Sequence, residues 1–155
     1  MTAEQYLGQI RKFDAMLANM REEYRQLEER YRRLVGLSSG LGDFSVTERV
    51  QSSRNLQQIP DAIAGYIDIE RDLIALNRRI EALKQKREDI IRTIEQLPTI
   101  EYKIIYNFFV KVEPSTMKEL AYSFGRSYDW VKKHKRKGMK IVQRILDGEE
   151  ATVSR

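Results

Sequence analysis

The stretch of sequence that decides the fold covers residues 6–34 and reads YLGQIRKFDAMLANMREEYRQLEERYRRL. Apolar residues recur in it at alternating spacings of four and three positions. They are Tyr6, Ile10, Phe13, Leu17, Met20, Tyr24, Leu27, Tyr31 and Leu34. This alternation is the heptad repeat of helices that pack along a shared seam. We therefore predict a helix from about Ala3 to Val35 and an all-α fold class.

Glycine and serine interrupt the heptad pattern over residues 36–59. Gly36 and the segment Ser38–Asp43 favour turns, because glycine releases the backbone and serine and aspartate bond to their own main chain. We expect a long connection here, with a short helix near residues 46–52. The segment lacks the Gly-Lys-Ser/Thr ending that a phosphate-binding P-loop needs.

The heptads resume after Pro60, which suits the first turn of a helix because its missing N–H costs nothing there. Pro98 is expected to end this second helix. One position of the seam is Arg87, which either fixes the register of the helices or extends its charged end to solvent. Extra apolar residues widen the stripe and indicate more than one packing partner. They are Ile63, Ile67, Ile74 and Ile91.

The two long helices can pair in more than one way. The connection between them is long enough for an antiparallel hairpin, a parallel pair or an exchange of helices between chains. We expect residues 1–97 to form a long heptad-patterned helical hairpin or coiled coil, with the long loop at 36–59. A small helical domain over residues 98–147 and a disordered tail over 148–155 are expected to follow.

The net charge of +5 lies entirely in the C-terminal third of the chain. The first 99 residues hold 16 basic and 16 acidic residues, whereas residues 100–155 hold 12 basic and 7 acidic ones. Between positions 126 and 140 there are seven basic residues and a single acid, Asp129. So basic a helix suits nucleic acid or an anionic membrane surface.

Several classes of function are disfavoured by composition. The chain has no cysteine and one histidine, His134, so we expect no disulfide, no zinc site and no other metal centre. No nucleophile–base pair, carboxylate dyad or phosphate cradle is found, so we expect neither enzyme activity nor a cofactor. The longest apolar stretches are far shorter than the ~20 residues of a membrane-spanning helix. With an N-terminus too polar for a secretory signal, the expected location is the cytoplasm.

Residues 117–136 have the pattern of a helix-turn-helix, two helices joined by a tight turn. Ala121 is small where the two helices would approach each other, and Gly125 lies at the turn, where a positive φ is tolerated. Ser127 is placed to cap the second helix. The inward apolar residues of the motif are Leu120, Phe124 and Val131.

The second helix of this motif would present a basic face to the major groove of double-stranded DNA. The candidate DNA-binding residues are Ser127, Tyr128, Asp129, Lys132, Lys133, Lys135, Arg136 and Lys137. We expect Trp130 to pack inward rather than against DNA. A helical hairpin with a solvated lysine face is the simpler alternative, but it does not explain why all the excess charge lies on one helix.

These residues resemble a known bacterial module. The segment Ile104–Ile145, with Lys118-Glu119-Leu120-Ala121, Gly125, Ser127 and Val131, resembles the fourth region of bacterial sigma factors, which reads the −35 promoter element. The whole chain resembles the ArpU- and RinA-like late-gene regulators of phages. In these a heptad-rich helix precedes a Val-Gln-Ser-Ser segment, here Val50-Gln51-Ser52-Ser53. The resemblance implies promoter DNA and RNA polymerase as partners.

Two positions depart from the sigma-like pattern. His134 stands where a second inward aliphatic residue is usual, and Gly138 stands where alanine is common. A glycine inside a helix costs about 1 kcal/mol relative to alanine. We therefore expect the second helix to be less stable, or bent, near Gly138.

Three functions are compatible with the sequence. The leading one is a sequence-specific transcriptional regulator of phage or prophage type, with residues 127–137 in the major groove and the N-terminal helices forming a homodimer or contacting RNA polymerase. The first alternative is a structural or assembly protein whose basic helix binds nucleic acid without sequence preference. The second is an antagonist that mimics the sigma module and binds polymerase alone. The outward lysines argue against the antagonist, because it would not need so basic a face.

Overall fold

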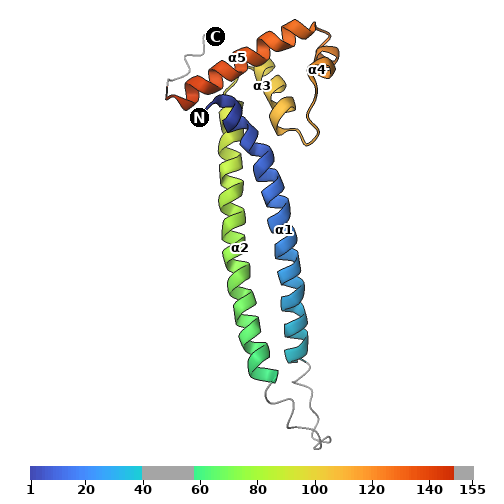
Figure 1. Cartoon of the computed structure of the whole chain (residues 1–155), viewed down its shortest axis with the longest axis vertical. Coiled ribbons are helices and arrows are strands. Elements are labelled where there is room, and N and C mark those ends of the chain that lie inside the picture. The colour runs from blue at the N-terminus through green and yellow to red at the C-terminus, as the bar shows by residue number, and fades with distance from the viewer. Residues whose placement is uncertain (40–57, 149–155) are drawn as a thin grey trace, which may run out of the picture. The chain divides into compact units, whose positions relative to one another are not determined.

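The structure is a computed structural model that describes residues 1–39 and 58–148. Helices make up the regular structure of these residues, with no strand among them, so the predicted all-α class is confirmed (Figure 1). The elements are α1 (Ala3–Ser39), α2 (Gln58–Glu95), α3 (Thr99–Ile105), the π-helical turn η1 (Tyr106–Val110), α4 (Met117–Phe124) and α5 (Tyr128–Leu146). The chain divides into two compact units: Met1–Met16 with the chain from Leu83 onward, and Leu17–Ala82.

The first long helix extends further than the sequence predicted. It continues to Ser39, so Gly36 does not end it. A single glycine costs a helix only about 1 kcal/mol, which the preceding turns can absorb. The expected short helix at 46–52, the Val50–Ser53 segment and all but the first residue of the expected tail lie outside the described residues.

The second long helix begins and ends close to the predicted points. Pro60 is the third residue of α2, within the first turn as expected. The helix ends at Glu95, two residues before the predicted end, and Pro98 becomes the N-cap of α3. Proline is compatible with that place because a helix cap does not donate its N–H to the helix.

In the first unit, the beginning of α1 and the end of α2 run antiparallel. The hydroxyl oxygens of Tyr6 and Thr93 lie 3.2 Å apart, and Nε of Arg87 lies 2.5 Å from Oδ1 of Asp14. Residue numbers therefore rise along α1 in the direction in which they fall along α2. The seam residue Arg87 thus has a specific acidic partner on the facing helix, although the sequence left its role open.

The core of the first unit is built from α1, α2, η1, α3 and α5 together with the chain between α2 and α3. Its buried residues are Ala3, Leu7, Ile10, Ile90, Ile94, Leu97, Ile105, Val110 and Val142. A polar contact joins the same parts, since the Ala3 N–H donates to Oε1 of Gln143 at 2.7 Å. The N-terminal end of α1 is therefore fixed to the C-terminal half of α5.

In the second unit, the remaining parts of α1 and α2 pack together through their seams. Its buried apolar residues are Leu17, Ile69, Leu76 and Ile80. Tyr31 and Tyr66 stack with their ring centroids 4.7 Å apart, and the Tyr31 hydroxyl donates to the Tyr66 hydroxyl at 2.6 Å. The buried residues of α2 in this unit, and Leu17 of α1, are thus all positions of the predicted heptad seam.

The segment after Pro98 is helical, as predicted, but its second half is a π-helical turn. The sequence predicted one short helix from Ile100 to Lys111, whereas α3 ends at Ile105 and η1 continues to Val110. The Lys111 N–H donates to the Tyr106 carbonyl at 3.0 Å, which closes the wider turn. No periodicity in so short a segment separates the two kinds of turn.

Candidate functional site

Helix α4 is closed at both ends by side-chain and backbone bonds. Thr116 Oγ1 accepts from the Glu119 N–H at 3.2 Å, and Glu119 accepts from the Thr116 N–H at 2.7 Å, which forms a capping box. Gly125 ends the helix with φ 59° and ψ 36°. The Arg126 N–H returns to the Ala121 carbonyl at 3.0 Å, so the turn is a Schellman motif. The positive φ predicted at Gly125 is confirmed.

Helix α5 begins directly after this turn. Ser127 caps it as predicted, because its Oγ accepts from the Trp130 N–H at 3.2 Å. The helix then runs without a break for 19 residues, through Gly138. Figure 1 shows α5 as one rod with α3 against it and α4 at its N-terminal end. The cap at Ser127 and the turn at Gly125 therefore determine where α5 begins and how it follows α4.

Of the inward residues predicted for this pair of helices, Leu120 and Val131 are buried and Phe124 is partly buried. Leu120 and Val131 form a cluster with Ile104 from α3. Further side chains pack against this cluster: Phe108, Met117, Ala121, Phe124 and Trp130. The Trp130 ring lies 5.8 Å from that of Phe124, so the expected inward packing of the tryptophan is confirmed.

Most of the predicted site residues lie together on the solvent face of α5. Tyr128, the first residue of α5, is 47% exposed. Ser127, Asp129, Lys132, Lys133 and Arg136 are also exposed. A hollow of about 540 Å³ runs over this face, lined by Asp129, Lys132, Lys133, His134, Arg136, Lys137 and Lys140. Lys140, four residues after Arg136 and thus one turn further on, belongs to this face although the predicted site ended at residue 137.

Two of the predicted cationic site residues have partners within the protein. The ammonium of Lys135 lies 4.1 Å from the ring centroid of Phe108, on the inward side of α5. The ammonium of Lys137 lies 3.0 Å from a carboxylate oxygen of Glu101. We define the basic face as Lys132, Lys133, Arg136 and Lys140, the exposed cations of α5 that line the hollow and have no such partner among residues 1–39 and 58–148.

A buried carboxylate under the basic face was not predicted. Glu101 of α3 is only 2% exposed, and its Oε1 lies 2.9 Å from Nδ1 of His134 and 3.0 Å from Nζ of Lys137. Burial by itself would raise the pKa of Glu101, but hydrogen bonds from these two side chains hold that pKa below its ordinary value. The carboxylate is therefore charged and pairs α3 with α5. Nothing in the sequence marked this glutamate among the others.

Gly138 explains how the two helices come so close. A Cβ placed on it would lie 3.0 Å from Cγ1 of Ile105 and 3.4 Å from Cβ of Glu101. Ile105 is fully buried on α3. The glycine, which the sequence marked as a weak point of the helix, is thus the contact that lets α3 approach α5 beside Glu101.

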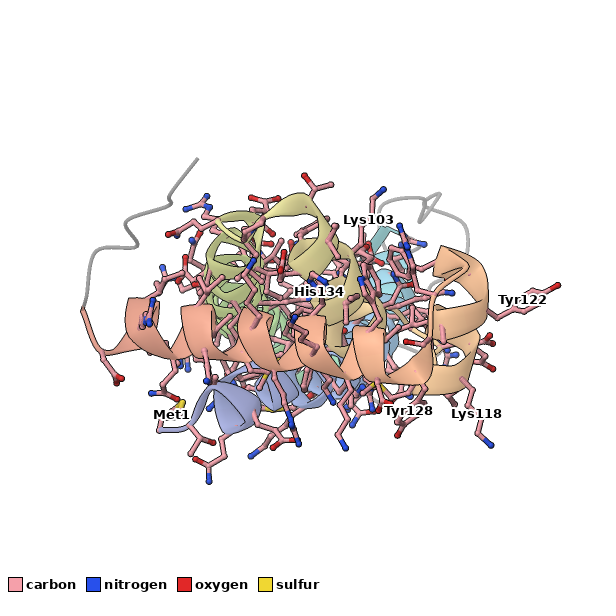
Figure 2. All side chains as sticks on the ribbon, turned by 90° about the horizontal axis from the view of Figure 1, so that it is seen from above. Met1, Lys103, Lys118, Tyr122, Tyr128 and His134 are labelled. Carbon is pink, nitrogen blue, oxygen red and sulfur yellow. The ribbon has the colours of Figure 1, made fainter. Side chains whose placement is uncertain are left out.

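Helix α4 adds exposed side chains that the sequence did not single out. Tyr122 is 91% exposed, and Lys118 lies one turn before it on the same helix. Figure 2 shows the Tyr122 side chain extending away from α4 and α5, and Lys118 also directed outward. Both side chains are therefore open to solvent.

The exposed side chains of this region on α5 are mostly cationic. Within residues 1–39 and 58–148, no group of three or more His, Cys, Asp or Glu side chains is placed to hold a metal ion. None of the described helices is long and apolar enough to cross a membrane.

Comparisons of the chain with protein-family models, with curated proteins and with solved structures found no match.

Proposed function

We propose that the protein is a sequence-specific DNA-binding regulator, with α4 and α5 acting as a helix-turn-helix. The observation that supports this most directly is the basic face of α5. Four cations lie on one exposed side of a helix whose other side is anchored by Val131, Trp130 and the Glu101 pairs. A rigid helix with a basic outer side is the form in which proteins read the major groove.

In the proposed complex, the beginning of α5 contacts base edges and its later turns contact phosphates. Tyr128 and Asp129 lie in the first turn, where recognition helices meet the bases. Lys132 and Lys133 follow one turn later, and Arg136 and Lys140 lie further from the groove floor. Phosphate contacts by these cations set the affinity and its salt dependence, whereas base contacts set the sequence preference.

Helix α4 would cross the DNA backbone in this arrangement, as the first helix of such motifs does. Lys118 and Tyr122 are exposed on it, and an ammonium and a phenol hydroxyl are both suitable donors to phosphate oxygens. The capping box at Thr116 fixes the start of α4. The first helix would therefore hold the orientation of α5 in the groove.

The wider biological role rests on the resemblance of the sequence. The sigma-like spacing from Ile104 to Ile145 and the ArpU- and RinA-like organisation point to promoter DNA in a phage or prophage. The long helices α1 and α2 would then dimerise or contact RNA polymerase. We propose this role as the context of DNA binding; the residues of α5 support the binding alone.

Selection from a library of random duplexes by the full chain tests the proposal. A sequence-specific regulator enriches one motif, and binding to that motif exceeds binding to random duplex by roughly 10³-fold or more. A protein that packages nucleic acid binds the library but enriches nothing. A sigma mimic that acts on polymerase alone binds neither, and either of these results would contradict the proposed function.

A further inference from the structure

Helix α2 has a second apolar face within the unit Leu17–Ala82. Ile69, Leu76 and Ile80 are buried in this unit. Ile67 and Ile74, in contrast, are 48% and 51% exposed. They lie seven residues apart, so about two helical turns place them one above the other. Half-exposed isoleucines at heptad spacing are typical of a helix face that packs against another helix.

Charged residues flank this apolar face in an ordered way. A hollow of about 350 Å³ runs over it, lined by Ile67, Glu70, Arg71, Ile74, Ala75 and Arg78. At about 100° of rotation per residue, Glu70 lies roughly 40° to one side of Ile74, while Arg71 and Arg78 lie roughly 60° and 40° to the other. The face therefore has an acidic edge, an apolar centre and a basic edge.

We propose that a second copy of this chain binds here, with the two α2 helices side by side and parallel. A twofold axis along a parallel pair brings the acidic edge of each helix against the basic edge of the other. Glu70 of each copy then faces Arg71 of the second copy, nearly at the same height. The pairs Ile67 with Ile67 and Ile74 with Ile74 form the apolar centre between these ion pairs.

The charges also decide the direction of the pair. An antiparallel twofold pair would keep the acidic edges together and the basic edges together, so Glu70 would meet Glu70 and Arg71 would meet Arg71. Like charges across a helix interface are unfavourable. Among the residues that the structure describes, the acidic partner of Arg71 is Asp68, at 3.8 Å and with both side chains more than 70% exposed. Arg71 can therefore turn toward a second copy at little cost.

Light scattering on the full chain tests whether the pair forms. We expect a dimer for the parent, and a monomer of unchanged helicity for the double variant Ile67→Ser with Ile74→Ser, because neither side chain belongs to the core. The control is Asp72→Ser, an exposed residue of α2 away from this face, which should remain dimeric. A monomeric parent, or a dimer that survives the double variant, would overturn the proposal.

Single cysteines test the direction, because the chain has none of its own. In a parallel pair Ile67→Cys and Ile74→Cys each meet their own copy, so both should form disulfide-linked dimers on mild oxidation, and Asp72→Cys should not. An antiparallel pair brings position 67 against position 74 instead. Cross-linking only in a mixture of the two variants would therefore overturn the proposed direction.

A charge exchange tests the flanking ion pairs. Glu70→Arg and Arg71→Glu each create like-charge contacts, so each variant should dimerise at least tenfold more weakly than the parent. Mixed together, they should form a heterodimer, because every contact is then between opposite charges. Failure of the mixture to associate would contradict the pairing. The outcome does not depend on the proposed DNA binding, which is assigned to α4 and α5.

Discussion

The carboxylate of Glu101 and the imidazole of His134 join α3 to α5 beneath the basic face, with Oε1 and Nδ1 2.9 Å apart. Lys137 binds the same oxygen from the other side at 3.0 Å. Helix α5 is thus held on α3 by the Glu101 carboxylate as well as by its apolar face, and His134, which stands where the sigma-like pattern has an inward aliphatic residue, contacts this buried acid.

Replacing Glu101 with glutamine should lower the stability of the chain. The amide keeps the size and one acceptor but loses the charge, and hydrogen bonds to a charged group contribute about 1.5–3 kcal/mol. We expect the free energy of unfolding at pH 7 to fall by about 1–3 kcal/mol, measured by urea denaturation of the full chain. An unchanged value would show that the pair contributes nothing to the fold.

The same pair predicts the behaviour of the protein in acid. Because the pKa of folded Glu101 is lowered below its ordinary value of 4.5, the stabilisation is complete above that value and is lost as the pH falls through the lower, folded value. The parent and the Glu101→Gln variant should therefore differ most near neutral pH and converge below pH 4.5. A difference that persists undiminished in strong acid would contradict the assignment.

Gly138 and Gly8 should respond to alanine in opposite directions. Each change replaces a glycine inside a helix with alanine, which by helix propensity alone would raise the free energy of unfolding by about 1 kcal/mol. At Gly8 nothing lies within 4 Å of the added Cβ, so Gly8→Ala should raise the melting temperature. At Gly138 the Cβ meets Ile105 at 3.0 Å, and this isoleucine is too tightly packed to move aside. Gly138→Ala should therefore lower the melting temperature, and a rise at both sites would refute the close contact.

The tyrosine pair of the second unit predicts an unusual titration. Donation to the Tyr66 hydroxyl is the largest of the effects that raise the pKa of Tyr31 to about 12. This contribution to stability is complete below pH 10 and is lost as the pH rises toward 12. Tyr66→Phe should return the pKa of Tyr31 toward 10, followed by NMR of labelled tyrosine rings, whereas Tyr122→Phe on α4 should not. Equal effects of the two variants would argue against the bond.

The sequence predicted those features that depend on local pattern. Heptad spacing predicted the two long helices and most of their buried residues, although the fully buried Leu7 of α1 lies outside the predicted seam. Glycine and serine predicted the turn at Gly125 and the cap at Ser127. The position of Val131 also predicted which side of α5 points inward. These features are local because each depends on residues within one or two turns of the chain.

The features that the sequence missed depend on contacts between distant segments. The ammonium of Lys135 lies over the Phe108 ring, and that of Lys137 lies against the Glu101 carboxylate; a charge count along α5 reveals neither contact. Gly138 looks like a weak point until Ile105 of α3 is placed against it. Each of these contacts depends on how α3 and η1 pack on α5, and no periodic pattern encodes that packing.

A salt titration of DNA binding by the full chain tests the central claim most directly. Log affinity should fall linearly with log salt concentration, and Lys133→Ala on the basic face should make the slope shallower by about 0.9 for one lost phosphate contact. Lys103→Ala removes the same charge from an exposed site on α3, and Lys135→Ala removes the cation that lies over Phe108. We expect both controls to keep the parent's slope. Equal slopes for all four proteins, or equal flattening by Lys103→Ala and Lys133→Ala, would contradict the assignment of the basic face to DNA.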